Sequence, residues 1–397
     1  MSGDHRSAFV IRDLDDEPTN EALVFYQQNL NIKDAPLRIN VIDQIDGVWK
    51  SVADVSTSAT GVDKVYFKNF RVDGPTDVVI GFNYIKNTEH KAVVYNYVDR
   101  MLTPKAEYSY LNLEVFDIDL DGLDEMLLIN RVPQLHEVEN APAGGAANRT
   151  TLRMLGDEGR GWWCSRRLRS TQVPNRSSIR TNGYISSAKR ALFIDENIGG
   201  GYLGTEVVYL ENGKLVNPFD KPVYQSLYKK SQRRSAVYCH DINQDTIVEI
   251  PVMRLFPGYT DEESPEAMWM IDWYQYGEEE IQKASTVFLN ANWGFYFELP
   301  EEWIGKVSVK RTLTDNEYSF VEYDESRPFE QNDTEIFRMR VVTTTDERTR
   351  EELESYQKLK LSSTALYDYY VYIPDNYDGA FQVDYKALQQ MFDVWRD

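Results

Sequence analysis

The side chains whose types and spacing could do chemistry are acidic, and they are spaced as in a calcium-binding loop. Calcium takes six to eight oxygen ligands at roughly 2.3–2.6 Å, so a short loop surrounds it only when side chains at alternating positions turn inward. With Asp117 as position one, carboxylates fall at positions one, three, five and nine, and a glycine at position six permits a tight turn. The predicted ligands are Asp117, Asp119, Asp121, Glu125 and the backbone carbonyl of Leu123. Because these carboxylates repel one another, a bound cation should stabilise the hairpin.

Two other segments carry acidic residues at the same spacing. One has Thr246 where glycine is preferred, and its predicted ligands are Asp241, Asn243, Asp245 and Glu249. The other has Pro18 in place of the glycine, and its predicted ligands are Asp13, Asp15, Glu17 and Glu21. The spacing therefore predicts one to three calcium ions. The alternative is a set of turns that Asx hydrogen bonds stabilise without any ion.

Two further copies of the loop are eroded. One begins at Asn69 and has Arg71 at position three, where its guanidinium could pair with Asp73 or Asp77 in place of an ion. We expect that loop to bind no metal. The other copy begins at Asp195 and continues into a glycine-rich loop.

Each loop lies between two strand-like runs, and the loops recur at a regular spacing. They begin at residues 13, 69, 117, 195 and 241, which is an average spacing of 57 residues. Four strands of about six residues with their turns occupy roughly 40–60 residues, the size of a β-propeller blade. After each loop the sequence supplies further strand-like runs, such as 37–42 and 48–53 joined by Asp46-Gly47. We therefore expect a mainly β chain with a five-bladed β-propeller over residues 1–284, the alternative being unrelated acidic turns.

The pattern changes after Ala284. Strand-like runs from Ser285 onward are followed by two candidate helices, 346–358 and 385–395. Residues 285–397 are therefore expected to form a separate, small α+β domain, which is long enough to bury its own core. Within the propeller, residues 131–148 are rich in alanine and glycine, and we expect them to form a long insertion on one rim.

Charge and hydropathy exclude several classes of partner. The formal net charge of −21 disfavours binding to nucleic acid and to anionic membranes. No apolar stretch approaches the roughly 20 residues of a transmembrane helix. The first ten residues lack the pattern of a secretory signal, which leaves two interpretations: a cytoplasmic protein, or one whose signal has been removed.

The loop sequence Asp-Ile-Asp-Leu-Asp-Gly-Leu-Asp-Glu from Asp117 resembles the acidic hairpins of FG-GAP and VCBS-type repeats in integrin-like propellers. The order of the segments beginning at Arg6, Ala191 and Tyr238 is similar to that in a group of uncharacterised surface lipoproteins from gut-type Firmicutes, mainly Clostridia. This second resemblance covers residues 6–300. It implies an extracytoplasmic protein of the bacterial cell surface, lipid-anchored in its precursor, and it implies no particular activity.

The sequence offers no specific catalytic motif. None of the four histidines has metalloprotease spacing, and neither a Gly-x-Ser-x-Gly elbow nor a phosphate-binding glycine loop occurs. We therefore expect a non-enzymatic interaction protein whose ligand is a protein or a glycan. The alternative is a carbohydrate-active hydrolase or lyase in the propeller funnel, because 64 acidic residues could supply a catalytic pair. The oligomeric state and a disulfide between Cys164 and Cys239 stay open.

Overall fold

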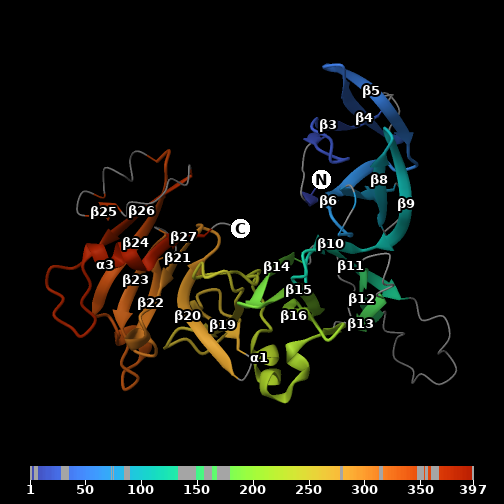
Figure 1. Ribbon diagram of the computed structural model, residues 1–397. Helices are drawn as coiled ribbons and strands as arrows, with labels where there is room; N and C mark the ends of the chain where they lie inside the picture. Colours follow the sequence, from blue (N-terminus) through green and yellow to red (C-terminus); the bar gives the residue numbers. More distant parts are fainter. Residues whose placement is uncertain are drawn as a thin grey trace. The chain divides into compact units, whose positions relative to one another are not determined.

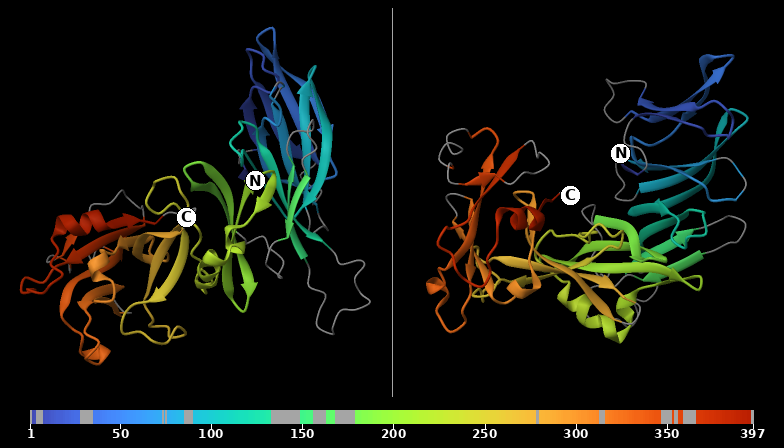
Figure 2. Two further views of the ribbon diagram at one scale, coloured as in Figure 1. Left: turned by 60° about the horizontal axis from the view of Figure 1, so that its bottom comes forward. Right: turned by 60° about the vertical axis from the view of Figure 1, so that its left-hand side comes forward.

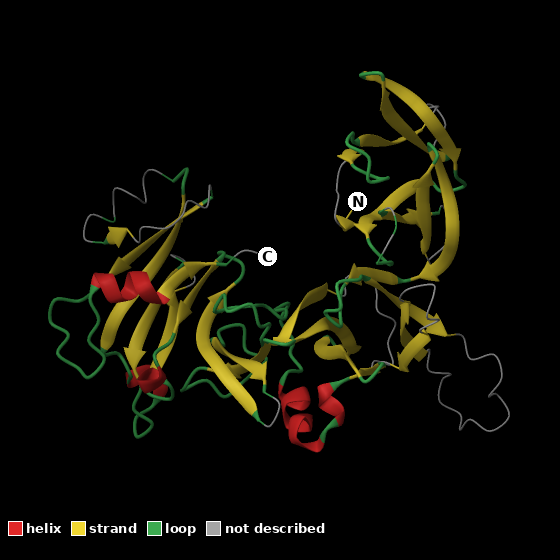
Figure 3. Cartoon of the chain, in the orientation of Figure 1, coloured by secondary structure: helices red, strands yellow, loops and turns green. Residues whose placement is uncertain are grey.

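The computed structural model describes residues 2–3, 8–27, 35–72, 74, 76–84, 90–132, 149–155, 163–167, 179–277, 280–312, 316–346, 353, 356–358 and 366–395. Strands dominate this part of the chain, and its α-helices are α1 (Gln225–Lys230) and α3 (Tyr385–Met391) (Figure 3). The prediction of a mainly β fold is therefore confirmed. Neither described helix has the length and apolar composition needed to span a bilayer. The chain divides into two compact units, Met1–Pro222 and Val223–Asp397.

In the first unit, four sheets follow one another along the chain, and the strands of each pair in sequence order (Figure 1). The first sheet consists of β2 (Phe9–Arg12), β3 (Glu21–Gln27), β4 (Leu37–Ile45) and β5 (Val48–Ser56). The second consists of β6 (Gly61–Lys68), β7 (Asp77–Asn83), β8 (His90–Val98) and β9 (Met101–Tyr110), with β1 (Ser2–Gly3) parallel to β6. The third consists of β10 (Asn112–Phe116), β11 (Glu125–Val132), β12 (Arg149–Leu155) and β13 (Trp163–Arg167). The fourth consists of β14 (Ile179–Ser186), β15 (Lys189–Gly199), β16 (Tyr202–Glu211) and β17 (Lys214–Val216).

Strands β7 and β11 are buried on both faces because the second and third sheets each pack against the sheet before and the sheet after them along the chain (Figure 2). In β7, Val78 belongs to a core shared with the first sheet, whereas its neighbour Val79 belongs to a core shared with the third. In β11, Met126 faces the core shared with the second sheet, and Leu127 faces the core shared with the fourth. Burial on both faces explains why these strands are continuous apolar runs rather than alternating ones.

The predicted hairpin turn at Asp46-Gly47 is present, and a second turn has the same form. Asp46 and Gly47 both have positive φ angles, 54° and 75°, and join β4 to β5. Asn212 and Gly213, at 51° and 71°, join β16 to β17. Two successive positive φ angles characterise the type I′ turn, whose twist matches that of the strands it connects.

The second unit contains two further five-stranded sheets. One consists of β18 (Ile250–Leu255), β19 (Trp269–Tyr276), β20 (Ile281–Asn290), β21 (Phe295–Glu298) and β27 (Phe392–Val394). The other consists of β22 (Val307–Thr312), β23 (Glu317–Glu322), β24 (Glu335–Thr343), β26 (Tyr367–Tyr372) and β25 (Gln357–Lys358). Both sheets contribute to a single aromatic core, in which Phe288 of β20 lies 5.8 Å from Phe320 of β23 between ring centroids.

This shared core changes the expected division of the chain. The expected boundary between residues 284 and 285 falls inside β20, whereas the compact units meet between Pro222 and Val223. The fifth repeat therefore belongs with the C-terminal segment. The physical reason is that β20 places Phe288 in the core of the C-terminal sheet, so a cut there would expose that core.

Three local expectations are corrected or lie outside the described residues. Helix α3 ends at Met391 rather than continuing to residue 395, because Phe392 leaves the helix to pair with Phe297 of β21. Of the expected helix 346–358, residues 347–352 are outside the described part, and Gln357–Lys358 form strand β25. Most of the expected insertion, 133–148, is also outside it.

The prediction that an acidic loop begins at Asp195 is wrong. Asp195 lies within β15, is buried, and accepts a hydrogen bond from the Thr205 hydroxyl of β16 (2.6 Å). The hairpin turns only at Gly199–Gly201, where all three φ angles are positive. The glycines predicted a turn correctly, but the strand before it is the second strand of its sheet and not the first.

Candidate metal centres

Three of the acidic loops share one hydrogen bond that closes the loop. The backbone N–H at position two donates to Oε2 of the glutamate at position nine in each case. The distances are 2.7 Å for Leu14 to Glu21, 3.0 Å for Ile118 to Glu125, and 2.9 Å for Ile242 to Glu249. The loops starting at Asp13, Asp117 and Asp241 are therefore three copies of one local structure.

The sequence fixes this geometry through the apolar residue at position two. Leu14, Ile118 and Ile242 are buried, and each belongs to the core beneath its loop. A buried side chain at position two anchors the start of the loop to that core. In the first and third loops the glutamate at position nine is the first residue of the next strand, so its carboxylate is drawn inside as well.

The third and fifth loops also share their backbone path. In the third, Asp117 accepts hydrogen bonds from the N–H groups of Leu120 (2.6 Å) and Gly122 (3.0 Å). In the fifth, Asp241 accepts from the N–H groups of Asp245 (3.0 Å) and Thr246 (2.8 Å). Positions four and six have positive φ in both loops, with values of 91° at Gly122 and 77° at Thr246. The role predicted for Gly122 is confirmed, and Thr246 occupies a conformation that is strained for a β-branched residue.

The first loop follows a different path. Asp13 Oδ1 accepts from the N–H of Asp16 at 2.8 Å, and Asp16 has a φ of 62°. Position six is Pro18, whose ring holds φ negative, so this loop lacks the second left-handed residue of the other two. Glu17, predicted as a ligand, is exposed and lies outside the acidic group formed by Asp13, Asp15 and Glu21.

The three acidic groups have the dimensions of a cation site. Each brings three carboxylates together with one oxygen per residue, and within each group these oxygens all lie within 4.8 Å of one another. Oxygens that bind one calcium ion at 2.3–2.6 Å can be at most about 5 Å apart, so the groups could surround such an ion. The donor atoms are all carboxylate oxygens, which suit a hard cation such as calcium or magnesium. The groups are Asp13, Asp15 and Glu21; Asp117, Asp119 and Glu125; and Asp241, Asp245 and Glu249.

Asp121 and Asn243, which are not members of these groups, lie beside them. Asp121 accepts a hydrogen bond from the backbone N–H of Leu123 (2.9 Å), as Asp245 within its group does from that of Ile247 (2.8 Å). Asn243 donates from its side-chain amide to Asp245 Oδ2 at 2.9 Å. These bonds are the Asx hydrogen bonds of the alternative prediction, and they coexist with the carboxylate clusters.

Burial makes the position-nine carboxylates hard to ionise. It raises the pKa of Glu125 to about 8, with further contributions from the neighbouring aspartates of the loop. It likewise raises the pKa values of Glu21 and Glu249 to about 7. In each case the N–H at position two acts in the opposite direction, by stabilising the charged form. A cation placed among these carboxylates would offset their mutual repulsion and favour the ionised state.

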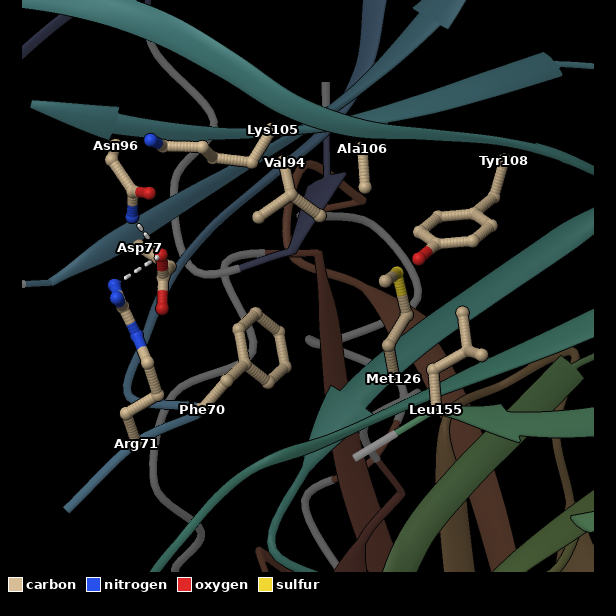
Figure 4. Close-up of a pocket in the computed structure, with 10 residues that line it drawn as sticks. All are labelled: Phe70, Arg71, Asp77, Val94, Asn96, Lys105, Ala106, Tyr108, Met126 and Leu155. Atoms are coloured by element: carbon tan, nitrogen blue, oxygen red, sulfur yellow. Dashed lines mark hydrogen bonds and ion pairs between the residues drawn. The ribbon is translucent and has the colours of Figure 1, made fainter. Parts of the chain in front are cut away.

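The loop beginning at Asn69 contains a cation of its own. Arg71 Nη2 lies 3.1 Å from Oδ1 of the buried Asp77, which occupies position nine, and Asn96 donates to the same oxygen (Figure 4). Phe70 at position two is buried, as in the other loops. Of the two partners predicted for Arg71, Asp77 is the one seen, and Asp73 lies outside the described residues. In this copy a guanidinium provides the positive charge next to the position-nine carboxylate.

One polar neighbour of the fifth loop could not be found from the sequence. The amide Nε2 of Gln275, on β19, donates to Asp245 Oδ2 (2.6 Å) and to Glu249 Oε1 (2.7 Å). Gln275 is 26 residues from Glu249, and no local pattern marks it.

His240, which precedes this loop, pairs with Glu249 through the backbone and has its ring 4.7 Å from that of Trp395. His240 therefore packs against Trp395 and forms an isolated β-bridge, and the strand expected before this loop is not formed.

Comparison with known proteins adds little to these observations. No protein-family model matches the chain, and no curated protein matches it. Among solved structures, the chain is similar to an acylaminoacyl peptidase from Pyrococcus horikoshii in an orthorhombic crystal form, with a TM-score of 0.29 and 10% sequence identity. The match covers 98% of this chain and 64% of the peptidase chain. A similarity at this level carries no argument about fold or activity.

Proposed function

We propose that this chain is a non-enzymatic interaction protein whose acidic loops bind calcium. The observation that carries the proposal is the recurrence of one carboxylate cluster in three loops, together with the guanidinium of Arg71 beside the position-nine carboxylate of a fourth. In one loop a side chain of the protein supplies the cation, whereas the other three loops have only carboxylates. The carboxylates of these three loops could therefore bind a free metal ion. The Asp117 loop, with its glycine at position six, fits calcium best, and we propose one to three ions in all.

We further propose that the sheets are blades of a five-bladed propeller that carries the C-terminal sheet. Two observations support this. Four-stranded meanders in sequence order are the building unit of a propeller, and each sheet of the first unit packs on the next. The residue before position one of a loop also contacts the following sheet. Arg12, before the first loop, has its guanidinium 5.6 Å from the ring of Phe67 on β6. Phe116, before the third loop, has its ring 5.0 Å from the guanidinium of Arg190 on β15.

In this proposal the ions rigidify the loops, and the protein acts outside the cytoplasm, at a bacterial cell surface, by binding a protein or a glycan. Bound calcium would hold each loop in one conformation by neutralising carboxylates that otherwise repel one another. The loops at Asp13 and Asp117 join the first and second strands of their sheets, and the loop at Asp241 directly precedes β18, the first strand of its sheet. Fixing these loops would therefore also fix the start of each sheet.

Calorimetric titration of the chelator-treated protein with calcium tests the metal part of the proposal. We expect saturable binding and a higher melting temperature with calcium than with chelator. No heat of binding and an unchanged melting temperature would contradict it. A glycan array, together with a screen of polysaccharide substrates, tests the interaction part: retention without turnover supports binding, whereas turnover supports a hydrolase or lyase.

A further inference from the structure

A pocket of about 540 Å³ lies beside the first acidic loop. Its wall comes from that loop and from the turn between β8 and β9, and it comprises Asp15, Glu17, Tyr97, Val98, Asp99 and Arg100. The volume is in the range of pockets that hold organic groups. The pocket therefore has room for a ligand larger than a metal ion.

The charges along this wall do not balance. Asp15, Glu17 and Asp99 are acidic, and Arg100 is the basic residue among the described lining residues. The Arg100 guanidinium lies 3.0 Å from Oδ2 of Asp43, a buried carboxylate on β4, which already offsets its charge. The pocket consequently presents a negative potential and should attract a positively charged group.

Tyr97 provides a second, independent indication of a ligand. Its side chain is fully buried, with 0% exposure, yet its hydroxyl has no hydrogen-bond partner. Tyr97 lines the pocket together with Asp15 and Glu17. Leaving a buried hydroxyl without a hydrogen-bond partner is unfavourable, because the group has lost its bonds to water. A ligand that brought an N–H donor would remove this cost.

The second sheet shows which chemical group can pair with the carboxylate at position nine of such a loop. There, Arg71 at position three supplies the guanidinium that pairs with the position-nine carboxylate of Asp77. In the first loop position three is Asp15, so no equivalent cation comes from the loop itself. Val98 of the pocket wall and nearby Met101 at the start of β9 are 49% and 60% exposed and could contact the methylene stem of a long cationic side chain.

We propose that this pocket binds the guanidinium group of an arginine side chain presented by a partner protein. The planar guanidinium has five N–H donors, enough to engage Asp15, Glu17 and the Tyr97 hydroxyl together. The proposal builds on the view that the acidic loops are cation sites, and it assigns an organic cation to the one loop whose Pro18 prevents the backbone path of the other two.

The test is an NMR titration of the full chain, in chelator, with N-acetyl-arginine amide and with its neutral isostere N-acetyl-citrulline amide. We expect saturable amide shifts in residues 13–21 and 97–101 with the arginine probe, and at least tenfold weaker binding of the citrulline probe. Absence of saturable shifts, or equal binding of the two probes, would overturn the proposal.

Two variants and a control locate the site. Tyr97→Phe should weaken the arginine probe at least threefold without lowering the melting temperature, because the hydroxyl has no partner in the free protein. Asp15→Asn should also weaken it at least threefold. Glu107→Gln, which alters an exposed carboxylate paired with Lys91, should leave binding unchanged. Unchanged binding in both pocket variants, or an equal loss in Glu107→Gln, would overturn the proposal.

A calcium titration of the same sample separates this proposal from the preceding one. Calcium-dependent shifts in the Asp117 and Asp241 loops depend only on the proposed calcium function. If those shifts occur while the arginine probe does not bind, the calcium function stands and the arginine site is rejected. If the arginine probe binds and no loop responds to calcium, the calcium function is rejected and the arginine site stands.

Discussion

Arg71 and Asp77 form an ion pair in which Nη2 and Oδ1 are 3.1 Å apart, at two loop positions where the first and third loops carry only carboxylates. Asp77 is almost completely buried, and Arg71 is about one third exposed. Without the guanidinium, Asp77 would keep the hydrogen bond from the Asn96 amide but would lose the positive charge of Arg71. The pair therefore provides a positive charge next to Asp77 from within the chain itself.

Arg71→Met should lower the free energy of unfolding by about 2 kcal/mol, because it leaves a buried carboxylate without its charge partner. Partial exposure of Arg71 keeps the loss below that of a fully buried pair. Chemical denaturation measures this change. Lys91→Met, which removes an exposed pair with Glu107, should cost less than about 1 kcal/mol and serves as the control. Equal effects of the two substitutions would contradict the prediction.

Chelator should lower the melting temperature, and Asp119→Ala should remove a large part of that sensitivity. Asp119 belongs to the acidic group of the third loop, so its loss leaves too few ligands for tight calcium binding. Differential scanning calorimetry with and without calcium measures the effect. Glu211→Ala, which alters a carboxylate paired with Lys189 at the surface, should keep the full calcium response. A full response in Asp119→Ala would argue against calcium in this loop.

Without metal, the protein should become less stable as the pH rises from about 5 to about 8. The pKa of Glu125 rises from its ordinary value of 4.5 to about 8 in the folded state because the carboxyl is buried. Between these values the folded state holds a proton that the unfolded state releases, so this contribution is complete below pH 4.5 and is lost as the pH rises through 8. Glu21 and Glu249, with pKa values raised to about 7, act in the same direction.

Melting temperatures measured in chelator across this pH range test the linkage. Glu125→Gln stays neutral at every pH, so this variant should show a smaller decline than the unaltered protein. An identical decline in both proteins would mean that Glu125 ionises normally in the folded state.

Gly122 and Thr246 occupy the same loop position, and exchanging their residue types should have opposite effects. Gly122→Ala should destabilise the third loop by about 1 kcal/mol, because φ at this position is 91°. An added Cβ would meet no atom within 4 Å, so the cost comes from backbone strain and not from a steric clash. Thr246→Gly should stabilise the fifth loop by up to about 1 kcal/mol by relieving strain at φ 77°. Urea denaturation of each single variant measures both changes, and effects of the same sign would contradict this account.

Local sequence was sufficient to predict the three carboxylate clusters. Their members lie within nine residues of one another, and an apolar residue at position two with a strand after position nine places them on one loop. The Arg71–Asp77 pair and the Asp46-Gly47 turn were predictable for the same reason, since each depends on neighbours in the chain. The strand order of the first three sheets followed from the spacing of the loops. In the fourth sheet a two-residue turn replaces the acidic loop and shifts Asp195 into β15, and the loop at Asp241 precedes the first strand of a five-stranded sheet.

The sequence by itself thus determined the strand content, the acidic loops and most hairpins, because hydrophobic alternation and turn chemistry act over a few residues. Only the tertiary structure decided which distant groups meet those loops: Gln275 beside Glu249, and the unpaired hydroxyl of Tyr97 beside the first loop. It also decided that β20 shares the core of the C-terminal sheet. These relationships depend on packing between residues far apart in the chain, and no local pattern specifies which buried surfaces meet.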